Sequence, residues 1–245
     1  MPTRDERQRR RHEEELALAR RLVALHALGT APPNAHWNLA AFEHRPASVG
    51  CTLVAAETAE NSTFSIHLAE VSGLNPIAGT LAAQCCLEIL RRTEGVDLVE
   101  LNRYFFDQPP GERAMIAAGS LRFDAGDSTW QGSFAGMVAP ILVDAGGGAE
   151  LLRGSGPFLG LTETTFPILR GRLRPGARLI LLAGSGAGEV LTDLLARLSK
   201  STPSPPATQI GRLGSELVAD LESGFGLTLV GIERTALPAP GANVE

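Results

Sequence analysis

The sequence has few lysines, tyrosines and cysteines, and it has no long apolar run. Lys200 is the single lysine, and there are one tyrosine and three cysteines. Apolar runs such as Leu179–Ala183 are far shorter than the roughly 20 residues that span a bilayer. Cys51, Cys85 and Cys86 form neither a disulfide framework nor a Cys-x-x-Cys metal pattern. These absences argue against a membrane-spanning helix, a disulfide-stapled domain and a zinc ribbon.

Charge is unevenly distributed along the chain. The formal net charge is −5, yet residues 1–21 hold seven arginines and five acidic residues, so they carry +2 and the remainder carries −7. An acidic body argues against nucleic acid as the main partner, because phosphate binding needs clustered basic residues. The Arg-rich start lacks the apolar segment of a secretory signal. We therefore expect a cytoplasmic protein.

The N-terminal part predicts one helix over residues 8–28. Leu18, Leu22 and Leu25 make a short apolar stripe, which suits either packing on its own domain or a homodimer contact. Both interpretations stay open. The sequence divides into an N-terminal helix and Pro-rich linker over 1–36, one domain over 37–235, and a flexible tail over 236–245.

The middle of the chain mixes strand and helix patterns. Strands are expected over Trp37–Phe42, Val49–Glu57, Thr63–Ala69, Ala114–Phe123, Thr129–Ala135, Ile141–Val143, Phe166–Arg172, Ala177–Ala183 and Gly226–Glu233. Helices are expected over Pro76–Arg92, Asp97–Phe106, Glu189–Lys200 and Ile210–Leu221, with a linker at Thr202–Thr208.

One stretch, Ser65–Pro76, carries a family resemblance. It reads as a buried strand, a turn at Ser72-Gly73 and the start of an apolar helix. It resembles the Gly-Asp-Val-Ser-Gly-His-Gly signature of SpoIIE/RsbU-type serine phosphatases of the PPM superfamily. The aspartate of that signature is a metal ligand, and Glu70 stands at its place here.

Further motifs resemble the same family in the same order. Alignment on the Pro46-Ala47 motif places the first ligand position at Cys51. The strand ending in Leu-Leu-Tyr-Thr-Asp-Gly in the family has Ser185 at its aspartate, and the last strand has Gly226 at a further one. Asn102, in a Leu-Asn-Arg motif, is expected to cap or pack.

The resemblance implies an α+β fold, a four-layer α-β-β-α sandwich of two antiparallel sheets flanked by helices. In the family, two Mn²⁺ or Mg²⁺ ions hold a water that attacks phosphoserine. Such ions prefer carboxylate ligands, but the four positions Cys51, Glu70, Ser185 and Gly226 keep one carboxylate. The resemblance therefore implies a pseudophosphatase with no catalytic residues and no metal cofactor.

Two alternatives remain open. An active phosphatase would need Mn²⁺ or Mg²⁺ at a rebuilt site, for which Glu70, Cys51 and His67 are weak candidates. A nucleotide-binding protein would use the Gly184–Gly188 turn, which follows a strand and precedes a helix. Glu189 occupies the third glycine position of that fingerprint and would repel a pyrophosphate.

A pseudophosphatase would act by binding proteins in bacterial partner-switching signalling. The partners that the resemblance implies are a STAS-type regulator, an anti-sigma kinase or an active phosphatase. Nucleic acid and membrane are not expected partners.

Overall fold

The computed structural model places two β-sheets between helices. It describes residues 36–45, 51–58, 63–74, 76–93, 97–107, 114–124, 126–200, 204–222 and 225–235, with residues 6, 8–10, 13–15, 17 and 18 near the N-terminus. These N-terminal residues are helical, and Arg10 Nε donates a hydrogen bond of 3.0 Å to Glu14. The rest of the predicted helix over 8–28, and the tail after residue 235, lie outside the described residues.

The first sheet is antiparallel throughout and has the strand order β1-β11-β10-β6-β7. Its strands are β1 (Trp37–His44), β6 (Ile141–Val143), β7 (Ala149–Leu151), β10 (Arg178–Ala183) and β11 (Leu227–Arg234). The helices α4 (Ala187–Lys200) and α5 (Pro206–Asp220) pack on its outer face. Every residue of β10 is buried, since this central strand is covered on both faces.

The second sheet has the order β2-β3-β4-β5-β8, with β9 also paired to β5. Its strands are β2 (Cys51–Thr58), β3 (Thr63–Ser72), β4 (Met115–Asp124), β5 (Thr129–Ala135), β8 (Ser155–Gly156) and β9 (Ile168–Arg172). All its pairs are antiparallel except the short pair of β5 and β8. The helices α2 (Pro76–Arg92) and α3 (Val99–Phe106) lie on its outer side.

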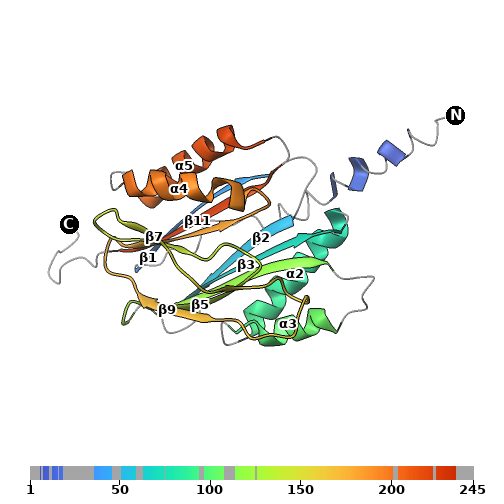
Figure 1. Cartoon of the computed structure of the whole chain (residues 1–245), viewed down its shortest axis with the longest axis horizontal. Helices are drawn as coiled ribbons and strands as arrows, with labels where there is room; N and C mark the ends of the chain where they lie inside the picture. Colours follow the sequence, from blue (N-terminus) through green and yellow to red (C-terminus); the bar gives the residue numbers. More distant parts are fainter. Residues whose placement is uncertain are drawn as a thin grey trace, which may run out of the picture.

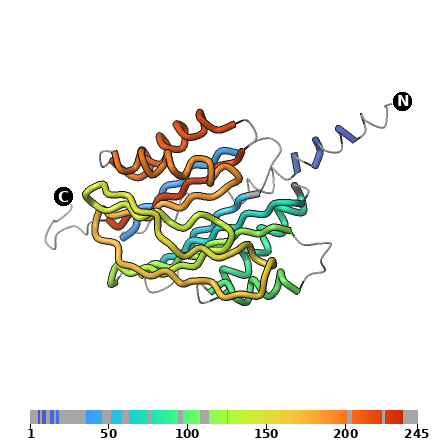
Figure 2. Tube along the Cα trace, viewed as in Figure 1, coloured from blue at the N-terminus to red at the C-terminus, as the bar shows by residue number. Residues whose placement is uncertain are grey.

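Figure 1 shows these elements as four layers, with α4 and α5 on one side, the two sheets in the middle, and α2 and α3 on the other side. The chain trace in Figure 2 shows that β1 runs beside β11, so the two ends of the domain meet in one sheet. The expected α+β sandwich of two mostly antiparallel sheets is confirmed.

The strand β3 faces two different cores, because alternate side chains of a strand point to opposite faces. Ile66 and Leu68 pack between the sheets, whereas Ala69 and Val71 pack against the α2 side. The same alternation puts His67 on the α2 side and Glu70 between the sheets. This division decides which candidate site residues can meet.

Several predicted boundaries are wrong, each for a local reason. The helix expected from Ile210 begins at Pro206, because proline suits the first turn of a helix, so the predicted linker Thr202–Thr208 is too long. The strand expected from Phe166 begins after Pro167, which has no N–H for the ladder. Asp97 lies before its helix, and its carboxylate accepts the Val99 N–H at 2.9 Å.

The short strands β7 and β8, of three and two residues, are not predicted by the sequence pattern. The described helices include none long and apolar enough to cross a membrane.

Candidate functional site

Glu70 connects the two sheets. Its Oε2 accepts the backbone N–H of Gly184, which follows β10, at 2.9 Å. Gly184 has a φ of +103°, and a Cβ there would come within 2.5 Å of the Gly226 carbonyl oxygen. Glycine is therefore required at residue 184 both by its backbone angle and by its neighbour. The carboxylate of Glu70 neither caps α2 nor lies free on the surface.

Partial burial sets the electrostatics of Glu70. Desolvation raises the pKa of its carboxyl above the ordinary 4.5, and the hydrogen bond from Gly184 offsets part of that rise. Removal from water disfavours the charged form, whereas an N–H donor favours it. The one carboxylate among the four aligned ligand positions thus already accepts a hydrogen bond from the protein backbone.

Ser185 and Gly226 are brought together by the structure. The N–H of Gly226 donates to Ser185 Oγ at 3.0 Å, and the N–H of Gly186 donates to the Gly226 carbonyl at 3.0 Å. These bonds close the Gly-rich turn against the start of β11. Ser185 acts here as a hydrogen-bond acceptor for the backbone, in place of a carboxylate.

The sheet register separates Cys51 from Glu70. Cys51 pairs with Val71, and the residue opposite Glu70 is Thr52. Side chains directly opposite in a sheet share a face, so Thr52 is the β2 residue beside Glu70. Thr52 was not predicted from the sequence. Whether Cys51 or Thr52 lies opposite Glu70 is decided only by the register of the strand pairing.

His67 lies on the other face of β3 from Glu70. It is 5% exposed, and its Nδ1 is 3.1 Å from Ser120 Oγ. Burial lowers the pKa of its imidazole to about 4. Of the three weak metal candidates, Glu70 and His67 therefore lie on opposite faces of β3, and Cys51 is paired in the ladder with Val71. Within the described residues, no group of three or more His, Cys, Asp and Glu side chains is placed to hold a metal.

Asn102 holds a loop, in agreement with its expected packing role. Its side chain is buried, its Oδ1 accepts the Gly160 N–H at 2.8 Å, and its Nδ2 donates to the Thr162 carbonyl at 3.0 Å. Gly160 has a φ of +76° and lies against Phe105. The loop that contains Gly160 and Thr162 is thus fixed onto α3.

The Gly184–Gly188 turn does not sit in a dinucleotide-binding fold. Its preceding strand β10 is antiparallel to both of its neighbours, β11 and β6. The fingerprint requires a parallel βαβ unit with the helix crossing to the next strand. The nucleotide-binding alternative is therefore not supported by the topology.

Known structures share this architecture. The RsbU and RsbW domains of a Mycobacterium tuberculosis protein match with a TM-score of 0.66 and 21% identity, over 86% of this chain and 64% of that one. The SpoIIE phosphatase domain of Bacillus subtilis matches with a TM-score of 0.65 and 10% identity, over 87% of this chain and 99% of that one. The SiaA-PP2C domain of Pseudomonas aeruginosa matches with a TM-score of 0.66 and 14% identity, over 96% and 100%.

These likenesses establish the fold of the PPM-type phosphatase domains. No family model and no curated protein matches the sequence. With identities of 10–21%, the neighbours say nothing of activity or partners in this chain.

Proposed function

We propose that this chain is a catalytically inactive SpoIIE/RsbU-like pseudophosphatase that acts by binding other proteins in bacterial signalling. The observation that carries the proposal is the hydrogen bond of 2.9 Å from Gly184 N–H to Glu70. It engages the one carboxylate that remains at the four ligand positions. The neighbouring positions supply the hydroxyl of Ser185 and the backbone of Gly226.

A pair of Mn²⁺ or Mg²⁺ ions does not fit this set of donors. Such ions are held by several anionic oxygens, and the phosphatase reaction needs them to generate and direct a water nucleophile. Glu70 offers one carboxylate, with a pKa raised by burial. Ser185 is neutral, and so is Thr52, the β2 residue opposite Glu70. We derive no hydrolytic step for this chain.

The candidate partners are those that the family resemblance implies. One neighbour joins RsbU and RsbW domains in a single chain, which supports partner-switching as the setting. The chain would bind a STAS-type regulator, an anti-sigma kinase or an active phosphatase through its surface. A homodimer through residues 8–28 remains a second proposal for assembly.

The first test is the melting temperature with and without millimolar Mn²⁺, Mg²⁺ or Zn²⁺. A ligand that binds only the folded state must raise the melting temperature. We expect no shift for the wild type or for Glu70→Ala, and a shift for the SpoIIE phosphatase domain as positive control. A phosphoserine-peptide hydrolysis assay on the same samples should show turnover for the control alone.

A manganese-dependent shift that disappears in Glu70→Ala would overturn the proposal. It would favour the alternative of an active phosphatase with a rebuilt site, and turnover by the wild type would then establish it. Partner binding is tested separately, by titrating purified STAS-type, kinase and phosphatase domains against the labelled chain.

A further inference from the structure

The outer face of the second sheet is only partly covered by helices. The helix α2 packs mainly on β2 and β3. Farther across the sheet, a polar row crosses β4, β5 and β9, in which Arg122 pairs with Gln131 and Gln131 pairs with Arg170. Directly opposite residues share a face, so two arginines stand on either side of an amide.

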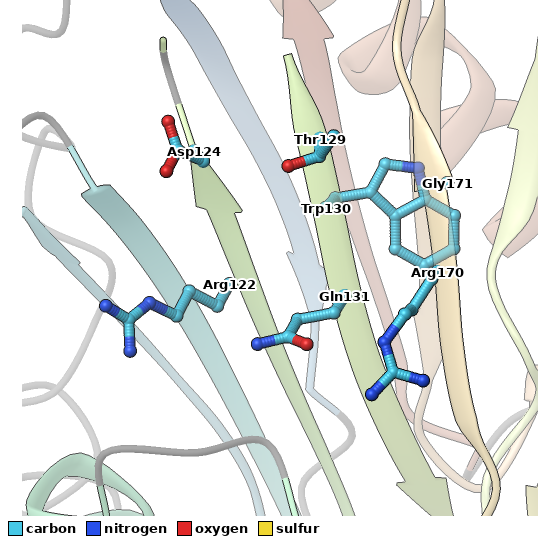
Figure 3. A pocket seen from close by; sticks show the side chains of 7 residues that line it. All are labelled: Arg122, Asp124, Thr129, Trp130, Gln131, Arg170 and Gly171. Carbon is cyan, nitrogen blue, oxygen red and sulfur yellow. The ribbon is translucent and has the colours of Figure 1, made fainter. Parts of the chain in front are cut away.

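This row forms one wall of a pocket of about 360 Å³. The pocket is lined by Arg122, Asp124, Thr129, Trp130, Gln131, Arg170 and Gly171. Figure 3 shows the guanidinium groups of Arg122 and Arg170 on the same side as the Gln131 amide, while Asp124 and Thr129 lie toward the opposite end. Donors of hydrogen bonds thus gather at one end, and a carboxylate lies at the other.

The base of the pocket is held by close packing. Trp130 is 5% exposed and pairs with Gly171 across the strands. A Cβ at Gly171 would come within 2.7 Å of the indole nitrogen, so only glycine lets β9 approach this ring. Arg172 fastens the same strand, since its Nε donates to the Asp127 carbonyl at 2.9 Å. Arg122 and Arg170 therefore project from strands that are held in place by strand pairing and by the packing of Trp130 against Gly171.

The two ends of the pocket select the chemistry of a ligand. Arginine binds a carboxylate or phosphate through a planar fork of N–H donors. Asp124 at the other end repels a polyanion. Its Oδ1 accepts the Gly126 N–H at 2.8 Å, so Oδ2 is the oxygen that would accept an N–H or O–H of a ligand. The volume lies in the range of about 300–1,000 Å³ typical of ligand pockets, well beyond one small anion.

We propose that this pocket binds an acidic side chain within an extended segment of a partner protein. The carboxylate or phosphate of that side chain lies between Arg122 and Arg170, and a neighbouring backbone N–H or hydroxyl faces Asp124 and Thr129. This binding site goes beyond the proposed function. It rests on that proposal in one respect, namely that the ligand is a protein. It uses no residue of the altered metal positions.

The test is fluorescence anisotropy with a labelled octapeptide that carries glutamate at alternate positions, and with a second version in which one central glutamate is phosphoserine. We expect saturable binding to the wild-type chain, weakened about tenfold or more by Arg122→Gln with Arg170→Gln, because charge-assisted hydrogen bonds are lost. The matched control is Arg92→Gln with Arg103→Gln, which removes two exposed arginines from α2 and α3. This control should bind like the wild type.

Three results would overturn the proposal. Equal binding by the pocket variant and the control would assign the affinity to net charge alone. Absence of binding by either peptide would remove the site, whatever the outcome of the metal and hydrolysis assays. Competition by free phosphate or free glutamate at the concentrations of the peptide would make it a small-anion site. Unchanged melting temperatures of both double variants would show that all chains are folded.

Discussion

Both sheets bury strongly polar side chains, and Arg178 in the first sheet and His67 in the second are accommodated in different ways. In the first sheet, Arg178 is 5% exposed and is surrounded by partners. Its Nη2 donates to Glu233 at 3.0 Å and to the Ser204 carbonyl at 2.7 Å, and its Nη1 donates to Gln209. In the second sheet, His67 is equally buried, and a hydroxyl, that of Ser120, lies at its Nδ1.

The difference shows two solutions to the same desolvation cost. A guanidinium stays charged, so it needs a carboxylate and further acceptors when it leaves water. An imidazole can give up its proton, and burial does lower the pKa of His67 to about 4. The charged Arg178 ties α5 to the first sheet, whereas the neutral, buried His67 makes the stability of the protein depend on pH.

The largest expected effect comes from Arg178→Ala. Removal of one member of a buried ion pair leaves Glu233 without its partner, which costs about 3–5 kcal/mol. Urea unfolding at pH 7 measures this loss. Arg212→Ala is the matched control on the same side of the molecule, because its side chain is 55% exposed. Equal losses in the two variants would contradict the importance of burial here.

The next effect is the pH dependence due to His67. Its folded pKa of about 4 lies below the ordinary 6.5, so the unfolded chain takes up the proton first. Stability is therefore lost as pH falls below 6.5, by roughly 2 kcal/mol between pH 7 and pH 5. His67→Gln should remove this slope, as measured by urea unfolding at pH 5, 6 and 7. An identical slope in wild type and variant would refute the assignment.

Glu70 gives the smallest effect, with the opposite sign. Its folded pKa is raised above 4.5, so the native state takes up the proton first as pH falls. The wild type should gain stability relative to Glu70→Gln when pH is lowered toward 4.5, because the buried carboxyl is neutralised in the native state before the unfolded chain takes up the proton. Ser65→Ala on the same strand serves as a control without this dependence. A wild-type advantage that grows with rising pH would exclude the raised pKa.

The order of motifs was sufficient to predict the fold. The stretch around Glu70, the Gly184–Gly188 turn and the last strand indicated a PPM-type sandwich, and the structure confirms its two sheets and outer helices. Strand periodicity also gave most element positions. The predicted boundaries were wrong at Pro206 and Pro167, where proline chemistry shifts the start of a helix and of a strand, and the short strands β7 and β8 were not predicted.

The candidate site was only partly predictable. Glu70, Ser185 and Gly226 could be named from the sequence, but their hydrogen bonds to backbone groups could not. Cys51 and Thr52 are adjacent in the chain, and only the pairing of β2 with β3 puts Thr52 opposite Glu70. The pocket between Arg122 and Arg170 had no sequence signal, because the two arginines meet across three strands.

The sequence by itself determined how many carboxylates stand at the positions that align with the family's metal ligands, since residue identity needs no coordinates. It also determined the apolar periodicity that builds the two sheets. The tertiary structure alone decided which side chains share a face and which backbone groups they bind. Glu70 and His67 are three residues apart, yet the alternation of β3 sends them to opposite cores. Register and burial, which arise only from long-range pairing, therefore set the chemistry of this protein.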